Sequence, residues 1–238
     1  MKANSLVIPT LFTISALLVL LTLGTWQLQR LEYKENLIQN LNEQAKMPAI
    51  QLPSDLSTVL DAEYRHVRVQ GQYMHDKEIY LFTGAMSARG PSGYNILTPF
   101  KTSDGRYILV DRGWVDSDRK LPERRPETLT EGAVDITAMI HKGERPGRFT
   151  PDNDIVKNLW FWIDLEAIKT YAGVPLENLY VRLLKNKEEV TFPIAGDATI
   201  KMTNDHLQYA ITWYTLALIL IVIYFLYSRK AKEQIDKR

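Results

Sequence analysis

The sequence predicts a membrane protein in which an N-terminal and a C-terminal transmembrane α-helix flank a strand-rich α+β domain with a curved or barrel-like sheet. No charged residue occurs between Lys2 and Arg30 or from Leu207 to Ser228 of the 238-residue chain. A helix that crosses a bilayer needs about 20 apolar residues, and both stretches supply them. From Tyr64 onwards, short runs of β-branched and aromatic residues are separated by turn formers, which is typical of antiparallel strands.

The first uncharged stretch predicts an uncleaved membrane anchor. Its apolar core, Leu6 to Leu23, is longer than the hydrophobic region of about 7 to 15 residues in a signal peptide, and no small-residue cleavage site follows it. Pro9 falls in the first turns, where a helix tolerates proline, and Trp26 falls at the level of the lipid headgroups. We assign residues 1–5 to a cytoplasmic N-terminus and residues 6–26 to the first transmembrane helix.

The helical pattern continues beyond this span. Leucines recur at helical spacing after Arg30. The helix should end before Met47-Pro48, because a residue that precedes proline is disfavoured in the helical conformation. We therefore expect a helical extension over residues 27–46 and a linker through Pro53.

The middle of the chain predicts short strands. The expected strands are Tyr64 to Met74, Glu78 to Thr83, Asn95 to Phe100, Arg106 to Val115, Val134 to His141, Asn158 to Ile163, and Tyr180 to Leu184. Ser103-Asp104-Gly105 is a hairpin turn signal between two of them. One helix is expected from Asp164 to Tyr171, with Asp164 as its N-cap and Gly173 at its end. We assign residues 47–205 to one strand-rich α+β domain.

The second uncharged stretch predicts a transmembrane helix over residues 206–227, followed by a basic tail over residues 228–238. The basic residues that flank the two spans are Lys2, Arg229, Lys230, Lys232, Lys237 and Arg238. Because positive charge collects on the cytoplasmic side of a membrane, both tails should be cytoplasmic. Residues 27–205 are then expected in the periplasm of a bacterial cell, anchored to the inner membrane.

The composition excludes several classes of function. A net charge of +1 and an isoelectric point near 7.8 give no reason to expect a nucleic-acid partner. The absence of cysteine excludes disulfides, thiolate metal sites and a cysteine nucleophile. His66, His75 and His141 lack metal-ligand spacing, and no nucleophile elbow, phosphate loop or dinucleotide motif occurs. We therefore expect a protein that is not an enzyme.

His206, at the start of the second span, is a candidate binding residue. Tyr209, Ala210 and Trp213 follow it at i+3, i+4 and i+7, so the four residues share one helix face. Neutral imidazole is a common ligand of metals and of haem iron, and a small residue such as Ala210 would leave room for a flat ring beside the helix. The alternative is a histidine that caps the helix or contacts lipid headgroups, among interfacial aromatic residues.

Gln27, Arg30 and Lys34 are expected on one face of the first helix, just outside the bilayer. Basic residues at this depth often extend their side chains to lipid phosphates. An arginine fork also matches carboxylate geometry, so Arg30 could instead hold the propionates of a tetrapyrrole at the membrane rim. The residues themselves do not decide between these interpretations.

Asp111-Arg112-Gly113-Trp114 closes the most apolar expected strand. Because side chains alternate along a strand, Arg112 and Trp114 should point to one face, and Asp111 and Gly113 to the other. We interpret this segment as a structural anchor. The aromatic run from Leu159 to Trp162 is likewise expected to pack in the core.

Several blocks of sequence resemble those of a known family. Near the helices they are Gly24-Thr25-Trp26-Gln27-Leu28-Gln29-Arg30 followed by Lys34, and Asn204, His206-Leu207, Tyr209-Ala210 and Thr212-Trp213. Between the helices they are Tyr64, Arg65, Val67, Gly71 and Tyr73, Gly93 to Pro99, Val110 to Val115, and Phe149-Thr150-Pro151 with Asn153, Trp160 and Asp164. In this order, over the whole chain, they resemble the surfeit-locus protein family of cytochrome oxidase assembly factors, and its bacterial members in particular. In one departure, Gln29-Arg30-Leu31 replaces a doubled arginine found in many relatives, which puts a role for a second basic residue there in doubt.

The resemblance implies a non-catalytic accessory protein that supports formation of the haem centres in subunit I of a haem-copper oxidase, by receiving or presenting haem a. It implies that His206 is the axial ligand of the haem iron. Tyr209, Ala210, Trp213, Gln27 and Arg30 are the further residues expected at such a site. Expected partners are oxidase subunit I, membrane lipid and, as a further candidate, haem a synthase. The alternative is a scaffold that binds no haem and stabilises oxidase assembly intermediates through its soluble domain.

Overall fold

The computed structural model describes residues 6–53, 63–84, 92–143, 145–185, 192–197 and 204–236. Its contacts divide the chain into two compact units, residues 1–40 with 201–238 and residues 41–200. We call the first unit the helix pair and the second the barrel domain, and we describe each by itself. Three basic residues used above to assign topology, Lys2, Lys237 and Arg238, lie outside the described residues.

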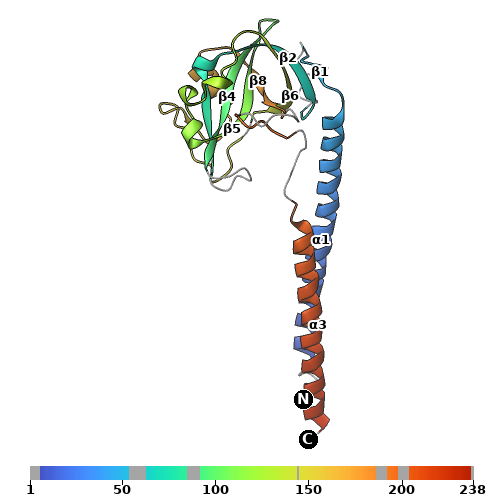
Figure 1. The fold of residues 1–238 in the computed structure, drawn as a ribbon. Helices are drawn as coiled ribbons and strands as arrows, with labels where there is room; N and C mark the ends of the chain where they lie inside the picture. The colour runs from blue at the N-terminus through green and yellow to red at the C-terminus, as the bar shows by residue number, and fades with distance from the viewer. Residues whose placement is uncertain are drawn as a thin grey trace. The chain divides into compact units, whose positions relative to one another are not determined.

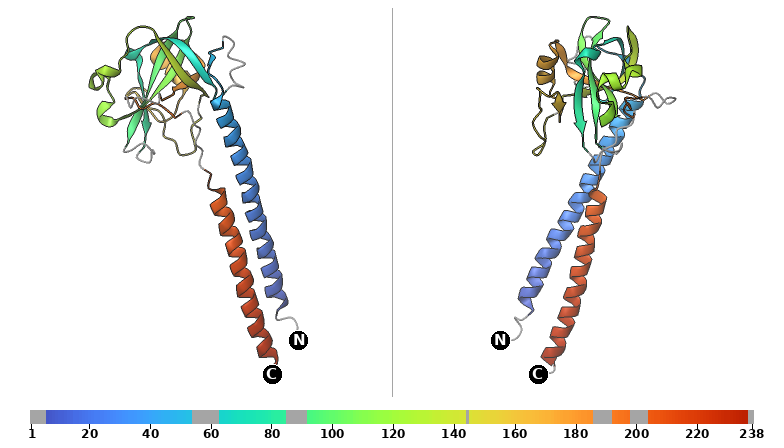
Figure 2. Two further views of the ribbon diagram at one scale, coloured as in Figure 1. Left: turned by 45° about the vertical axis from the view of Figure 1, so that its right-hand side comes forward. Right: turned by 60° about the vertical axis from the view of Figure 1, so that its left-hand side comes forward.

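Two long helices, α1 (Val7–Lys46) and α3 (His206–Asp236), form the helix pair (Figures 1 and 2). Both are long and apolar enough to cross a membrane. They are antiparallel, since Thr10 lies 2.5 Å from Tyr224 through their hydroxyl oxygens near one end. Helix α1 runs on past the first span and ends just before Met47-Pro48, as predicted. Helix α3 continues beyond residue 227 into the basic tail.

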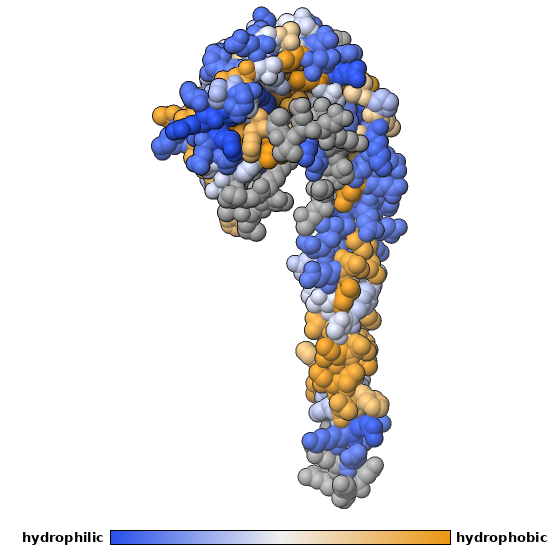
Figure 3. Space-filling model, viewed as in Figure 1, coloured by the Kyte–Doolittle hydropathy of each residue, from blue (hydrophilic) through white to orange (hydrophobic). Residues whose placement is uncertain are grey.

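Small residues let the two helices approach each other. Ala210 and Ala217 of α3 are buried, and a Cβ at Gly24 of α1 would lie 2.9 Å from the ring of Tyr214. Close approach at small residues is how helices associate in membranes, where exposed apolar side chains face lipid. In the space-filling view, hydrophobic residues cover the middle of the helix pair (Figure 3). This arrangement agrees with the predicted spans.

A closed barrel of five strands forms the centre of the second unit. The whole sheet has eight strands among the described residues, which are β1 (Ile50–Gln51), β2 (His66–Tyr73), β3 (Ile79–Thr83), β4 (Gly93–Thr102), β5 (Tyr107–Asp116), β6 (Val134–Lys142), β7 (Leu159–Trp160) and β8 (Leu176–Leu183). The sheet order is β1-β2-β6-β8-β5-β4-β3-β7, and β2 also pairs with β4, which closes the ring β2-β6-β8-β5-β4. Strands β5 and β8 are parallel, while the other pairs in the ring are antiparallel. The predicted barrel-like sheet is confirmed.

The barrel domain has a core on each face of its sheet. Alternate residues of the strands fill the first core, among them Val67, Val69, Ile136, Ala138 and Ile140. The helix α2 (Leu165–Ala172) packs Leu165 and Ile168 into the second core, together with Leu109, Trp160 and Tyr180. The predicted burial of the aromatic residue Trp160 is thereby confirmed.

Local turn chemistry matches the predictions closely. The Asp164 side chain accepts a hydrogen bond from the amide of Ala167 at 3.1 Å and caps α2. Gly173 ends α2 in the left-handed conformation, with φ of +63°. Gly105 has φ of +88° in the hairpin between β4 and β5. These residues act on backbone within a few positions of themselves, which is why the sequence reveals them.

Most predicted strand boundaries differ from the observed ones by one or two residues, and three differences are larger. The expected strand from Asn158 to Ile163 is reduced to β7, because the Asn153 side chain accepts the amide of Phe161 at 2.8 Å and takes it out of the sheet. Strand β8 begins at Leu176, before the expected start at Tyr180. The expected linker contains β1, which pairs with β2 in parallel. Edge pairing of this kind depends on a distant strand and leaves little signal in its own residues.

Candidate functional site

In the helix pair, the first helix presents Gln27 to His206 at the start of α3. Gln27 is 9% exposed, and its Oε1 lies 2.7 Å from Nδ1 of His206. Because a carbonyl oxygen only accepts hydrogen bonds, Nδ1 of His206 carries a hydrogen and donates a hydrogen bond to Gln27. In the neutral tautomer with this hydrogen, the lone pair is on Nε2. The sequence placed both residues at one membrane depth, and the structure brings them together.

This arrangement suits an imidazole that binds iron in a haem. Metal-binding histidines usually donate their other ring N–H to a fixed acceptor, which sets the tautomer and the ring orientation, as Gln27 does here. Within the described part of the chain, no group of three or more His, Cys, Asp or Glu residues could hold a metal ion. A single histidine is too few ligands for a structural zinc site but enough for haem, whose macrocycle supplies the remaining nitrogens. The donor set therefore fits a haem group.

Ala210 lies in the contact between the helices. It is 1% exposed and is one turn from both His206 and Tyr214, which contact Gln27 and Gly24 of α1. The space expected beside Ala210 is occupied in this structure, and a role of Ala210 in binding a ligand stays a prediction. A small residue can leave space for a ligand or for a neighbouring helix. In this structure α1 fills the space beside Ala210.

The other predicted site residues lie around this contact. Tyr209 is 56% exposed, whereas Trp213 is partly buried and its Nε1 has no hydrogen-bond partner within the part of the chain that the structure describes. Arg30 is exposed, and its guanidinium carbon lies 5.0 Å from the centre of the Tyr33 ring. Among the described residues, no hydrogen bond or ion pair links Arg30 to His206. The structure thus joins Gln27 and His206 but does not bring Arg30 into their contact.

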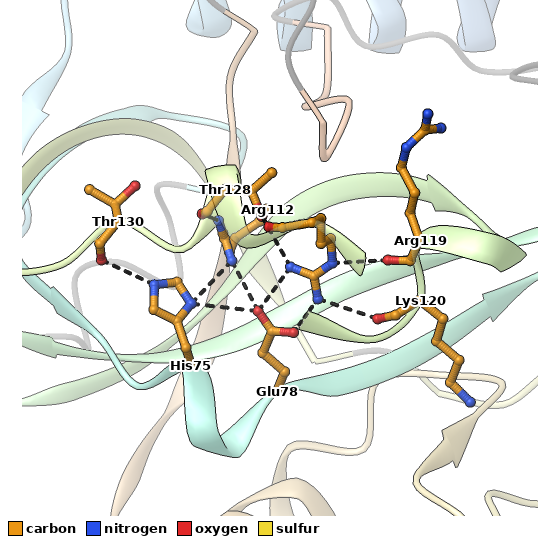
Figure 4. Close-up of polar contacts among 8 residues, drawn as sticks. His75, Glu78, Arg112, Arg119, Lys120, Thr128 and Thr130 are labelled. Carbon is orange, nitrogen blue, oxygen red and sulfur yellow. Dashed lines mark hydrogen bonds and ion pairs between the residues drawn. The ribbon is translucent and has the colours of Figure 1, made fainter. Parts of the chain in front are cut away.

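A buried charge network in the barrel domain was not predicted from the sequence. Glu78, which precedes β3, forms ion pairs with Arg112 of β5 at 3.0 Å and with Arg125 (Figure 4). All three residues are buried, and Arg125 is 0% exposed. Glu78 is the first residue of an expected strand, and Arg125 lies in an irregular segment where no periodicity marks a residue as buried. Arg125 precedes a proline in a segment rich in turn formers, and charged residues in such segments are usually exposed to solvent.

Arg125 fastens the segment between β5 and β6 to Glu78. This segment contains three short 3-10 helices, η4 (Ser117–Arg119), η5 (Pro122–Arg124) and η6 (Pro126–Thr128). The Arg125 guanidinium donates to the carbonyl oxygens of Arg119 at 3.0 Å and Lys120 at 3.3 Å. It also donates to both carboxylate oxygens of Glu78. One buried side chain therefore holds several irregular turns.

Arg112 occupies the other side of Glu78. Its guanidinium also donates to the carbonyl oxygen of Thr128 and lies 4.9 Å from the centre of the Tyr73 ring. Nδ1 of His75 lies 3.3 Å from the Arg112 nitrogen, and Nε2 lies 3.1 Å from the carbonyl oxygen of Thr130. Since a carbonyl accepts, Nε2 of His75 donates to Thr130. Nδ1 faces both the Arg112 guanidinium and the Glu78 carboxylate, and it lies 3.5 Å from Oε1 of Glu78.

The pKa directions follow from burial and neighbouring charge. Burial acts to raise the pKa of Glu78, but hydrogen bonds from His75 and Arg125 and the charges of both arginines lower it below its usual value. Burial lowers the pKa of Arg112. One carboxylate faces two guanidinium groups, so the network carries an excess of positive charge.

Asp111 points away from this network, as the strand alternation predicted for it and Arg112. Its carboxylate accepts hydrogen bonds from Asn95 at 3.1 Å and from Arg182 at 2.9 Å, in addition to the amide of Gly113. Gly113 has φ of +116°, and a Cβ there would lie 2.2 Å from the carbonyl oxygen of Ile194. These contacts support the interpretation of this segment as a structural anchor.

Comparison with known proteins identifies a family. The model of the SURF1 family matches residues 14–218. A SURF1-like protein of Rickettsia conorii is 34% identical over 239 residues, which cover 97% of this chain and 92% of the relative. Surfeit locus protein 1 of Homo sapiens is 34% identical over 217 residues, covering 85% of this chain and 72% of the relative. A SURF1-like protein of Drosophila melanogaster is 35% identical over 213 residues, which cover 82% of this chain and 69% of the relative.

Proposed function

This chain belongs to the SURF1 family, and on that premise we propose that it is an assembly factor for a haem-copper cytochrome oxidase that binds haem a through His206 and aids its delivery to subunit I. The observation that carries the proposal is the hydrogen bond of 2.7 Å between Gln27 and His206, which leaves Nε2 of the histidine as a potential iron ligand. Oxidase assembly itself comes from the family resemblance.

Three further residues of the helix pair would contribute to haem binding. Gln27 fixes the tautomer and the orientation of His206. Tyr209, which is more than half exposed, can lie against an apolar ring, and the exposed Arg30 can pair with propionates. Bound haem supplies a flat apolar macrocycle with two carboxylates, which suits a boundary between hydrocarbon and water.

The proposed location is the bacterial inner membrane. We place α1 and α3 across the bilayer, both tails in the cytoplasm and the barrel domain in the periplasm. The length and apolar character of the helices and the basic residues after α3 support this placement. The proposed role is non-catalytic, with oxidase subunit I, membrane lipid and haem a synthase as partners.

One observation favours the alternative of a scaffold that binds no haem. Ala210 is buried and Gln27 nearly so, hence the hydrogen bond between Gln27 and His206 could serve only to fasten the two helices. Such a scaffold would act through the barrel domain.

Purification after coexpression with the haem a biosynthetic enzymes separates the two functions. A chaperone should copurify with haem a and show its Soret band, and a strain that lacks the chaperone should assemble an oxidase deficient in haem a. A scaffold should be purified without haem, although its loss would still lower the amount of oxidase. Protein that is free of haem under these conditions would contradict our proposal.

A further inference from the structure

A cavity of about 470 Å³ lies in the barrel domain beside the buried charge network. Its lining includes the polar residues Arg112, Tyr73 and Thr130 and the apolar residues Leu183, Phe192 and Pro193. Its volume falls within the range of about 300 to 1,000 Å³ that is usual for small-molecule sites. The cavity thus combines a cationic group with apolar walls.

The positive charge beside this cavity is not fully balanced. Glu78 contributes one negative charge, while Arg112 and Arg125 contribute two positive charges (Figure 4). Glu127 also borders the cavity, but it is exposed and forms no ion pair with Arg112 among the described residues. Arg112 is only 5% exposed and shares its counterion Glu78 with Arg125, and buried charge that is incompletely balanced is costly. A single negative charge from a ligand would restore neutrality.

Tyr73 adds an unused hydrogen-bond donor next to Arg112. Its ring lies against the guanidinium, and among the described residues its hydroxyl has no hydrogen-bond partner. Burial raises the pKa of Tyr73 to about 12, against the opposing charge of Arg112. The hydroxyl therefore stays protonated at neutral pH and can donate to an anion.

We propose that this cavity binds a carboxylate carried on an apolar body. The carboxylate pairs with the guanidinium of Arg112 and the hydroxyl of Tyr73, and the apolar body lies against Leu183, Phe192 and Pro193. A singly charged carboxylate matches the single excess charge, whereas a phosphate dianion would reverse it. The ligand is either the free C-terminus of a polypeptide or a small organic acid. The site uses residues of the barrel domain alone, so it stands apart from the proposed haem site.

Binding to the purified full chain in detergent at pH 7 tests this proposal, with phenylacetate as the probe. Ligand-observed NMR should show saturable binding of phenylacetate. Phenylacetamide, which has the same shape without the charge, should bind at least about tenfold more weakly, because it cannot neutralise Arg112. Inorganic sulfate, which is a dianion at this pH, should not compete. Equal binding of the amide, or competition by sulfate at similar concentration, would overturn the proposal.

Two variants test the assignment of the residues. Tyr73→Phe keeps the ring on Arg112 but removes the hydroxyl, and it should weaken phenylacetate binding about tenfold. Arg112→Lys keeps the positive charge but removes the guanidinium, which can donate two parallel hydrogen bonds to a carboxylate. This variant should also weaken binding of phenylacetate. The matched control is Arg148→Gln, a change of an exposed arginine outside the cavity, which should leave the affinity unchanged. Wild-type affinity in Tyr73→Phe would contradict the proposal even if Arg112→Lys fails to fold.

A peptide that ends in phenylalanine distinguishes the two sources of the carboxylate. Tighter binding of the peptide with a free C-terminus than of phenylacetate, lost on C-terminal amidation, identifies a polypeptide end as the ligand. Tighter binding of phenylacetate identifies a small organic acid. Both results support the carboxylate site, whereas equal binding of the free and amidated peptides, with no phenylacetate binding, would contradict it.

Discussion

Glu78 is the carboxylate that both Arg112 and Arg125 contact inside the barrel domain. Its removal would leave two buried guanidinium groups without a counterion. We therefore expect Glu78→Gln to destabilise the barrel domain by about 3 to 5 kcal/mol. Thermal unfolding of the purified protein and its abundance in cells measure this effect. The exposed Glu127 is the control, and Glu127→Gln should change stability by less than about 0.5 kcal/mol. Equal stability of the two variants would contradict the role of Glu78.

His141 should make the barrel domain sensitive to acid. Its ring stacks on Tyr180 at 5.1 Å between centres, and burial, with the charge of Arg182 as a smaller cause, lowers its pKa from 6.5 to about 3. His141 binds a proton more readily in the unfolded chain than in the folded chain. The stability contributed by neutral His141 is therefore complete above pH 6.5 and is lost as the pH falls towards 3.

The phenylalanine variant tests this dependence on pH. His141→Phe keeps a stacked ring without a titrating group, so its stability should fall less between pH 6.5 and pH 4 than that of the wild type. Denaturation temperatures measured across this range provide the comparison. Parallel pH profiles for the two proteins would assign the acid sensitivity to other groups.

At the scale of elements, the contact between α1 and α3 depends on Gly24. Any side chain there meets the ring of Tyr214, whose hydroxyl also lies 3.1 Å from the hydroxyl of Thr25. Gly24→Leu should therefore separate the helices locally and lower both the abundance of folded protein and its haem content. The control is Thr22→Leu on the exposed side of α1, which should have little effect on either quantity. A Gly24→Leu protein with normal abundance and normal haem content would contradict this view of the contact.

The elements that the sequence predicts are those set by nearby residues. Asp164 and Gly173 mark both ends of α2 because each satisfies backbone groups within the same helix. A barrel-like sheet was expected, but the pairing of β2 with β4 that closes it, through Gly71 and Thr102, could not be predicted, since it joins strands that are not adjacent in sequence. The same holds for Glu78 and Arg125, which become partners only when the barrel is formed. Gln27 and His206 could be matched because a bilayer fixes the depth of each residue along its helix.

At the scale of the whole molecule, topology is the premise of the proposed function. A periplasmic reporter inserted after Ser103, in the exposed hairpin between β4 and β5, should be active. A reporter fused after residue 238 should behave as cytoplasmic, because basic residues follow α3. A cytoplasmic signal from the Ser103 reporter would place the barrel domain on the other side of the membrane and would overturn the scheme.

The visible absorption spectrum of the His206→Ala protein tests the central claim most directly. The protein is purified after coexpression with the haem a biosynthetic enzymes and compared with Gln208→Ala, a change of an exposed residue in the same helical turn. Because His206 supplies the iron ligand in our account, His206→Ala should lose or shift the Soret band at unchanged abundance, while Gln208→Ala should match the wild type. An unaltered Soret band and full haem stoichiometry in His206→Ala would show that iron is bound elsewhere.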